Sequence, residues 1–161
     1  MPRERPSALA KAMNFLAARS LSEKELLLKL RKAGYSDAEC DSAIAECVKL
    51  HYLNDEQLTA DCVDILHQRN LGARQIRQKL LRRGLDGEEI SGLLESKPEE
   101  EEEAARRAME GKLRLLSRES DPRKKREKLF RFMAGRGFSP GVIFKVMDAV
   151  GASPESNALI T

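Results

Sequence analysis

The sequence repeats itself at a spacing of 50 residues, and this repetition limits the folds open to the chain. The segment RSLSEKELLLKLRKAGYSDAEC, from residue 19, aligns with RNLGARQIRQKLLRRGLDGEEI, from residue 69. Leu26 falls on Ile76, and Gly34 falls on Gly84. A third copy, KLFRFMAGRGFSPGVI, starts at residue 128. A chain with such a period is built from similar small units arranged in series.

Each copy predicts two helices joined by a short turn. In the first copy, Leu26 and Leu30 lie four residues apart, as on one face of a helix, and Gly34 follows. A glycine there can adopt the left-handed conformation that ends a helix. Ser36 and Glu39 then match the capping box that begins the next helix. In the second copy the turn glycine is Gly84 and the capping residues are Asp86 and Glu89. In the third copy they are Gly137 and Ser139, with Pro140 at the first helical position and Val142 in place of the Glu.

A further helix precedes each pair. The apolar spacing predicts these helices over Ser7–Arg19, Leu58–Gln68 and Pro98–Ser117. We therefore expect an all-α protein of three tandem three-helix repeats, helix-turn-helix-like, in an elongated arrangement, because such repeats contact mainly their neighbours. The expected repeats span residues 7–50, 54–95 and 98–150, and a disordered tail is expected over residues 151–161.

The composition agrees with helices and excludes several other classes of protein. Charged residues make up 34% of the chain and aromatic residues 4%, which is a poor composition for a β-sandwich. The three cysteines are odd in number and form no CxxC pair, so we expect neither a disulfide framework nor a metal site. Cys40 and Cys47 suit buried positions on one helix face. No apolar run reaches membrane-spanning length and the N-terminus lacks a secretory pattern, so we expect a cytoplasmic protein without a membrane contact.

Basic side chains are concentrated in two segments. From Ile65 to Leu85 there are six Lys or Arg and no acidic residue, and from Arg123 to Arg131 there are six with only Glu127 opposing them. Such clusters favour an acidic or polyanionic partner, although solvated helix faces are the plainer alternative for any one of them. The candidate contact residues are Arg69, Arg74, Arg77, Lys79, Arg82, Arg83, Arg123, Lys124, Lys125, Arg126, Lys128 and Arg131.

The basic helix of the second copy has an outward face without acidic residues. At about 100° per residue, Ile76 and Leu80 point inward, while Arg74, Gln78 and Arg82 form an outward row. A solvated helix usually interleaves acids with its bases, so this face is typical of a contact surface. The helices that follow the turn in the first two copies are acidic, which disfavours sequence-specific reading of the major groove. Weak, salt-sensitive binding to DNA phosphates stays compatible with the pattern.

The sequence contains no constellation of residues that an enzyme would need. His51 and His67 have no nearby Cys, Ser or acidic pattern typical of a triad or a metal site. We interpret both as polar residues at a surface or an interface. The glycines are scattered singly, without a loop that could cradle a phosphate. We therefore expect a protein that is not an enzyme and that needs no cofactor.

Three stretches together resemble the bacterial RecX family of recombination regulators. They are LSEKELLLKLRKAGYSDAEC, then HYLNDEQLTADCVDILHQRNLGARQIRQKLLRRGL, and finally DPRKKREKLFRFMAGRGFSPGVIFKVM, in the family's order. The resemblance covers residues 8–150 and implies three tandem three-helix repeats in an elongated, curved protein. It also implies a monomer that binds the filament of the RecA recombinase on DNA and restrains it. The alternative left open by the residues is a standalone helix-turn-helix DNA-binding regulator.

Overall fold

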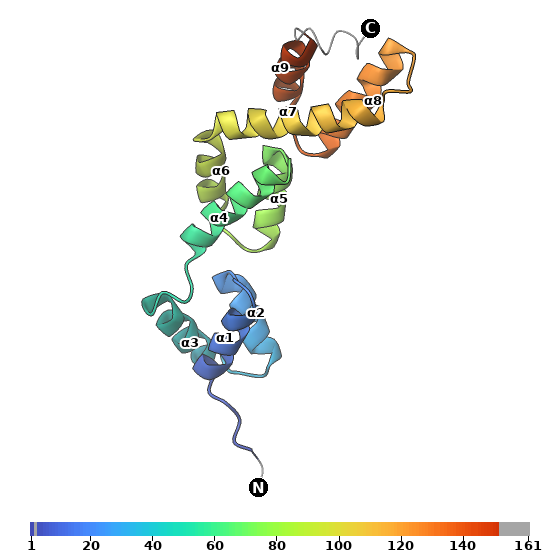
Figure 1. Cartoon of the computed structure of the whole chain (residues 1–161). Coiled ribbons are helices and arrows are strands. Elements are labelled where there is room, and N and C mark those ends of the chain that lie inside the picture. The colour runs from blue at the N-terminus through green and yellow to red at the C-terminus, as the bar shows by residue number, and fades with distance from the viewer. Residues whose placement is uncertain (2, 152–161) are drawn as a thin grey trace.

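The computed structural model describes residue 1 and residues 3–151, and within this part of the chain it contains nine helices and no strand (Figure 1). The expected all-α fold is confirmed. The predicted disorder of the tail concerns residues that lie outside the described part, apart from Gly151, which ends the last helix. The helices are α1 (Ala8–Ala18), α2 (Glu23–Lys32), α3 (Asp37–Lys49), α4 (Asp55–Gln68), α5 (Ala73–Arg82), α6 (Gly87–Glu95), α7 (Pro98–Leu115), α8 (Pro122–Gly135) and α9 (Pro140–Gly151).

Each set of three successive helices encloses its own hydrophobic core. Leu26 and Leu30 lie in the core of α1–α3, Ile76 in that of α4–α6, and Met133 in that of α7–α9. All four side chains are buried, which confirms the inward positions read from the repeat. The three sets follow one another along an elongated molecule (Figure 1). The repeat boundaries at 7–50, 54–95 and 98–150 remain predictions, because the cores alone do not define them.

The turn inside each copy has the expected backbone conformation. The φ angles of Gly34, Gly84 and Gly137 are 90°, 79° and 96°, all in the left-handed region. After the first of these turns, the Ser36 side chain accepts a hydrogen bond from the Glu39 backbone N–H. The Glu39 carboxylate in turn accepts one from the Ser36 N–H, so the predicted capping box of α3 is complete.

The caps of the later copies are partial. The Asp86 side chain accepts a hydrogen bond from the Glu89 backbone N–H at 2.9 Å and caps α6 as expected. The Glu89 Oε1 atom, however, is buried without a hydrogen-bond partner, so the predicted reciprocal bond of a capping box is missing. In the third copy, Ser139 Oγ accepts from the Val142 N–H at 3.3 Å. One side-chain oxygen is enough to orient the start of each helix.

The start of α5 is capped by a different part of the chain. Where the first copy has Ser22, which caps α2, the second has Gly72, which offers no side-chain hydrogen bond. The Gly72 N–H instead donates to the carbonyl oxygen of Arg136 at 2.9 Å, and the Arg74 N–H donates to that of Gly137 at 3.1 Å. The turn between α8 and α9 therefore supplies acceptors that the first turn of a helix otherwise lacks.

This cap needs the two backbones to lie very close together. A Cβ atom on Gly72 would fall closer to the carbonyl carbon of Gly137 than the 3.0 Å that real Cβ contacts respect. The Ala73 N–H donates at 3.0 Å to the carboxylate of Glu101 in α7, so the third repeat satisfies a further donor. Glycine at position 72 is therefore a packing requirement between the second and third repeats.

Replacing Gly72 by Ala should destabilise the protein by about 1–3 kcal/mol, because the added methyl group must push the two backbones apart. Gly111 is the matched control, since it lies within α7 with open space around its Cα position. There, Gly→Ala should stabilise the protein by about 0.5–1 kcal/mol through the higher helix propensity of Ala. Urea unfolding followed by circular dichroism measures both changes. Equal effects of the two substitutions would contradict the proposed close approach.

The two histidines occupy different environments. His51 is exposed, whereas His67 is buried in α4 against α7, with only 3% of its surface accessible, and so lies at the interface between the second and third repeats. Its Nδ1 atom lies 3.6 Å from the carboxylate of Glu100 in α7. Burial lowers the pKa of His67, and the nearby charge of Glu100, which favours the protonated form, only partly offsets this. The fold therefore favours the neutral imidazole.

A lowered histidine pKa makes the fold sensitive to acid. The contribution of neutral His67 to the free energy of unfolding is complete above the ordinary histidine pKa of about 6.5. It falls as the pH drops below that value, because the unfolded chain then binds the proton more readily than the folded chain does. Urea unfolding at pH 7.5 and 5.5 should show a drop in stability that His67→Gln reduces by up to about 1 kcal/mol. His51→Gln, at an exposed position, should leave the drop unchanged. An identical drop in all three proteins would refute this role of His67.

Candidate partner interface

Helix α5 is amphipathic: its buried face is apolar and its exposed face is basic. Ile76 and Leu80 are buried, and Arg74, Gln78 and Arg82 are exposed, as the wheel predicts. The cations are held in place by the burial of the inner face and by the cap from the third repeat. The helix therefore offers its charges on a rigid support.

The structure brings only part of the two basic segments together. The Arg74 guanidinium lies 3.4 Å from the carbonyl oxygen of Ala134, and Gln75 Nε2 lies 3.3 Å from that of Gly135, so the start of α5 abuts the end of α8. Arg131 is one turn before this end of α8. Arg123 lies at the opposite end, roughly 18 Å away along the helix axis. The two segments therefore meet at one end and diverge at the other.

Some of the candidate cations already have partners within the chain. Arg77 donates to the carbonyl oxygen of Gly87 at 2.8 Å and to the hydroxyl of Ser91. Lys128 pairs with Glu119 at 2.6 Å, and Arg123 pairs with Glu127 at 3.4 Å. Exposed pairs of this kind contribute little to stability. Lys125 is half-buried, and within the described residues no ion pair or side-chain hydrogen bond is formed by Arg69, Lys79, Arg82, Lys124, Arg126 or Arg131.

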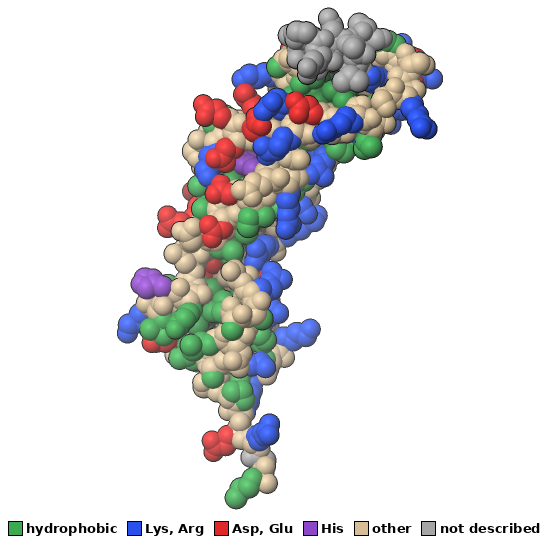
Figure 2. Space-filling model, in the orientation of Figure 1, with side chains coloured by type: hydrophobic (Ala, Val, Ile, Leu, Met, Phe, Trp, Pro, Cys, Tyr) green, Lys and Arg blue, Asp and Glu red, His purple; other side chains and the backbone are tan. Residues whose placement is uncertain are grey.

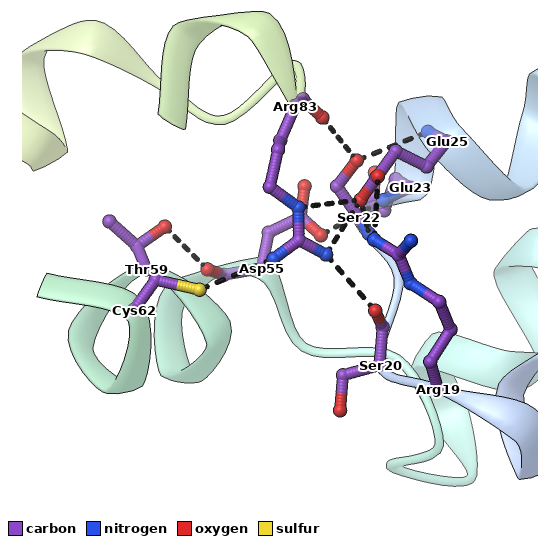
Figure 3. Close-up of polar contacts among 9 residues, drawn as sticks. All are labelled: Arg19, Ser20, Ser22, Glu23, Glu25, Asp55, Thr59, Cys62 and Arg83. Atoms are coloured by element: carbon purple, nitrogen blue, oxygen red, sulfur yellow. Dashed lines mark hydrogen bonds and ion pairs between the residues drawn. The ribbon is translucent and has the colours of Figure 1, made fainter. Parts of the chain in front are cut away.

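Arg83 occupies a different position from its neighbours, at the junction of the first and second repeats (Figure 3). Its guanidinium donates to Glu25 Oε1 from Nε at 3.1 Å and from Nη2 at 2.9 Å. The Nη2 atom also donates to the carbonyl oxygen of Ser20 at 3.0 Å, and Nη1 lies 3.3 Å from the Cys62 sulfur. These partners come from the segment before α2, from α2 itself and from α4. Arg83 therefore joins the repeats, a role that its position in a basic cluster did not predict.

Two further hydrogen bonds complete this junction (Figure 3). Ser22 Oγ donates to the carbonyl oxygen of Arg83, and the Glu23 N–H donates to the Asp55 carboxylate at 2.9 Å. Burial raises the pKa of the Glu25 carboxyl, but hydrogen bonds from Arg83 and from the Ser22 N–H outweigh it, and the pKa is lowered. The Glu25–Arg83 pair is thus held in its ionised form.

A second basic helix extends the charged surface beyond the predicted residues. Figure 2 shows Lys and Arg side chains along one long edge, over α5 and α2, while Asp and Glu gather on the opposite edge around α4, α6 and the start of α7. The 50-residue period could have identified α2, because it is the counterpart of α5. Its basic residues Lys24, Lys29, Arg31 and Lys32 are all exposed, and Arg31 pairs with Asp37.

The described residues offer neither a metal site nor a membrane span. Over residues 3–151, no group of three or more His, Cys, Asp or Glu side chains is placed to hold a metal ion. In the same part of the chain, no helix combines the length and the apolar character needed to cross a membrane.

Comparison with known proteins agrees with this architecture. The model of the first three-helix domain of RecX matches residues 8–47, and the model of the third matches residues 99–147. The regulatory protein RecX of Legionella pneumophila is 31% identical over 147 residues, which cover 91% of this chain and 96% of the relative. The chain belongs to the RecX family. RecX of Deinococcus radiodurans is also 31% identical, over 91% of this chain and 70% of that protein.

Solved RecX structures share the fold. The crystal structure of RecX from Lactobacillus salivarius superposes with a TM-score of 0.80 at 21% identity, over 88% of this chain and 93% of that one. A second regulatory protein RecX superposes with a TM-score of 0.76 at 20% identity, over 88% and 70% of the two chains. The curated relatives are named as regulatory proteins rather than as enzymes.

Removing the Arg83 guanidinium should weaken the contact between the first two repeats. Arg83→Gln should lower the free energy of unfolding by about 1–2 kcal/mol, since the half-buried carboxylate of Glu25 loses its charged donor. Combined with Glu25→Gln in a double-mutant cycle, it should give a coupling energy of about 1 kcal/mol. Arg82→Gln is the neighbouring control and should change stability by less than about 0.5 kcal/mol, because its side chain is exposed. A coupling energy near zero would rule out the bridge.

Proposed function

We propose that this RecX family member binds the RecA–DNA filament and inhibits its ATP hydrolysis, strand exchange and growth. It would thereby modulate recombination, DNA repair and the SOS response as a cytoplasmic monomer. Family membership supports the choice of RecA as the partner. The observation that carries the proposal is the basic edge over α5 and α2 of an elongated molecule, opposite an acidic edge (Figure 2).

The shape and charge of this edge suit a long anionic partner. A nucleoprotein filament offers both DNA phosphates and acidic protein surface along its length. Weak contacts from successive repeats would add, because linked sites bind with a high effective concentration. Lys79 and Arg82 would contribute directly, as both are exposed and unpaired within the described residues. Arg83 would contribute by holding the first repeat in line with the second.

The alternative, sequence-specific DNA binding, is less well supported. The helices that follow the glycine turns in the first two repeats begin with acidic residues, Asp37 and Glu39 in α3 and Glu88 and Glu89 in α6. A recognition helix places its N-terminal residues against bases and phosphates, where carboxylates would be repelled. Non-specific contact of α5 and α8 with phosphates does not have this difficulty.

Arg82→Glu should weaken inhibition of RecA without unfolding the chain. The measurement is RecA-dependent ATP hydrolysis on single-stranded DNA, with the inhibitor well below the amount that covers the DNA. We expect half-inhibition to need roughly fivefold more of the variant, as one exposed charge contact is worth about 1 kcal/mol. Lys49→Glu is the control: it makes the same change of charge at an exposed site in the last turn of α3.

Three results would oppose this proposal. Absence of inhibition by the native chain would reject RecA as the target. Equal loss of inhibition in Arg82→Glu and Lys49→Glu would show that net charge matters rather than the α5 edge. Tight, sequence-dependent binding to duplex DNA at physiological salt would favour the alternative regulator.

A further inference from the structure

An apolar groove with a volume of about 620 Å³ lies between α8 and α9, and its lining includes Ala134, whose carbonyl oxygen contacts Arg74 of α5. Its floor contains Phe130, Phe144 and Met147. The two phenylalanine rings pack against each other, with centroids 5.4 Å apart and planes inclined by 31°. Phe144 remains 46% exposed. An exposed aromatic pair in a groove is costly in water and is typical of a binding surface.

The repeat shows that the fold itself does not need this aromatic pair. Phe130 and Phe144 are 14 residues apart, and the equivalent positions in the second repeat are Arg77 and Ser91. There the Arg77 guanidinium donates a hydrogen bond to the Ser91 hydroxyl and also to the Gly87 carbonyl. The same scaffold positions are thus satisfied internally by polar groups in one repeat and left as an apolar surface in the other.

The rim of the groove is positively charged. Arg123, Arg126 and Arg131 line it, and Glu127 is the acidic residue among the lining side chains. Glu127 is paired with Arg123 at 3.4 Å. The guanidinium groups of Arg126 and Arg131 form no ion pair within the described residues and are exposed. The groove therefore combines an apolar floor with uncompensated positive charge on its edge.

We propose that this groove binds an acidic amphipathic helix of a partner protein. Apolar side chains spaced along one face of that helix would rest on Phe130, Phe144 and Met147, as in other complexes of a helix in a groove. Its carboxylates would pair with Arg126 and Arg131, where guanidinium groups suit bidentate contact. This inference goes beyond the proposed function, because it adds an apolar groove to the charge contacts proposed above and does not require the partner to be RecA.

Nucleic acid fits the groove less well than a helix does. Bases bind aromatic side chains by stacking on an open ring face. Here the Phe130 and Phe144 rings cover part of each other and, with Met147, form one continuous apolar floor. Such a floor matches aliphatic side chains, and its volume accommodates several of them.

A designed peptide tests the proposal on the full chain. The probe is a fluorescent 16-residue helical peptide with Leu at helical spacing on one face and Glu on the others, and a scrambled peptide of the same composition is its control. In anisotropy titrations we expect the patterned peptide to bind at least tenfold more tightly than the scrambled one. Phe144→Ala and Arg131→Glu should each weaken binding at least fivefold. Ile65→Ala, which alters a side chain with the same 46% exposure in α4, should have no effect.

Each other result would overturn the proposal. No binding of the patterned peptide, or equal binding of the scrambled one, would remove the helix as the occupant. Unchanged binding by Phe144→Ala, with its melting temperature confirming a folded chain, would remove the groove as the site. Displacement of the peptide by a 16-nucleotide oligo-dT would assign the surface to nucleic acid. A dimer in sedimentation experiments that Phe144→Ala abolishes would assign it to a second copy of the chain.

Discussion

The backbone contact between Gly72 and the turn at Gly137 determines how the second and third repeats are joined. Two N–H groups at the start of α5 donate to carbonyl oxygens of that turn, so the cap of one repeat belongs to the next. A side chain at position 72 would separate them. The contact holds the start of α5 against α8, where Arg74 also reaches the carbonyl oxygen of Ala134, while the burial of Ile76 and Leu80 turns Arg74 and Arg82 outward. The basic edge is thus a product of the junction as well as of the helix.

The two junctions of the molecule are chemically different. Between the second and third repeats, backbone groups meet directly, and Arg107 of α7 adds a hydrogen bond to the Asn70 side chain at 2.8 Å. Between the first and second, the main contacts are the charged hydrogen bonds of Arg83 with Glu25 and Ser20. Charged contacts respond to salt and pH, and both junctions contain them, since His67 meets Glu100 between the second and third repeats.

Periodicity predicted what lies inside a repeat and little of what lies between repeats. The buried positions of Ile76 and Leu80 and the turn at Gly84 follow from local spacing, because burial and helix termination act over a few residues. The role of Arg83 does not follow from local spacing. Its partners Glu25 and Ser20 lie 58 and 63 residues away, and the sequence does not distinguish it from the other basic residues around it. The sequence also left open whether His67 lies at a surface or an interface, because a polar residue on a helix gives no sign that another helix covers it. The basic residues of α2, in contrast, could have been predicted from the repeat, because α2 is the counterpart of α5.

The separation of the three cores has a consequence for motion. Leu26 and Ile76 belong to different clusters, so within the described residues no single packed core runs the length of the molecule. Bending at the Arg83 junction would exchange a few polar contacts with water and leave each core intact. Bending at one junction would therefore change the curvature of the protein without unfolding a repeat. Among the described residues, α4 and α6 pack against α7, whereas the helices of the first repeat pack little against those of the second, so we expect bending first at the Arg83 junction.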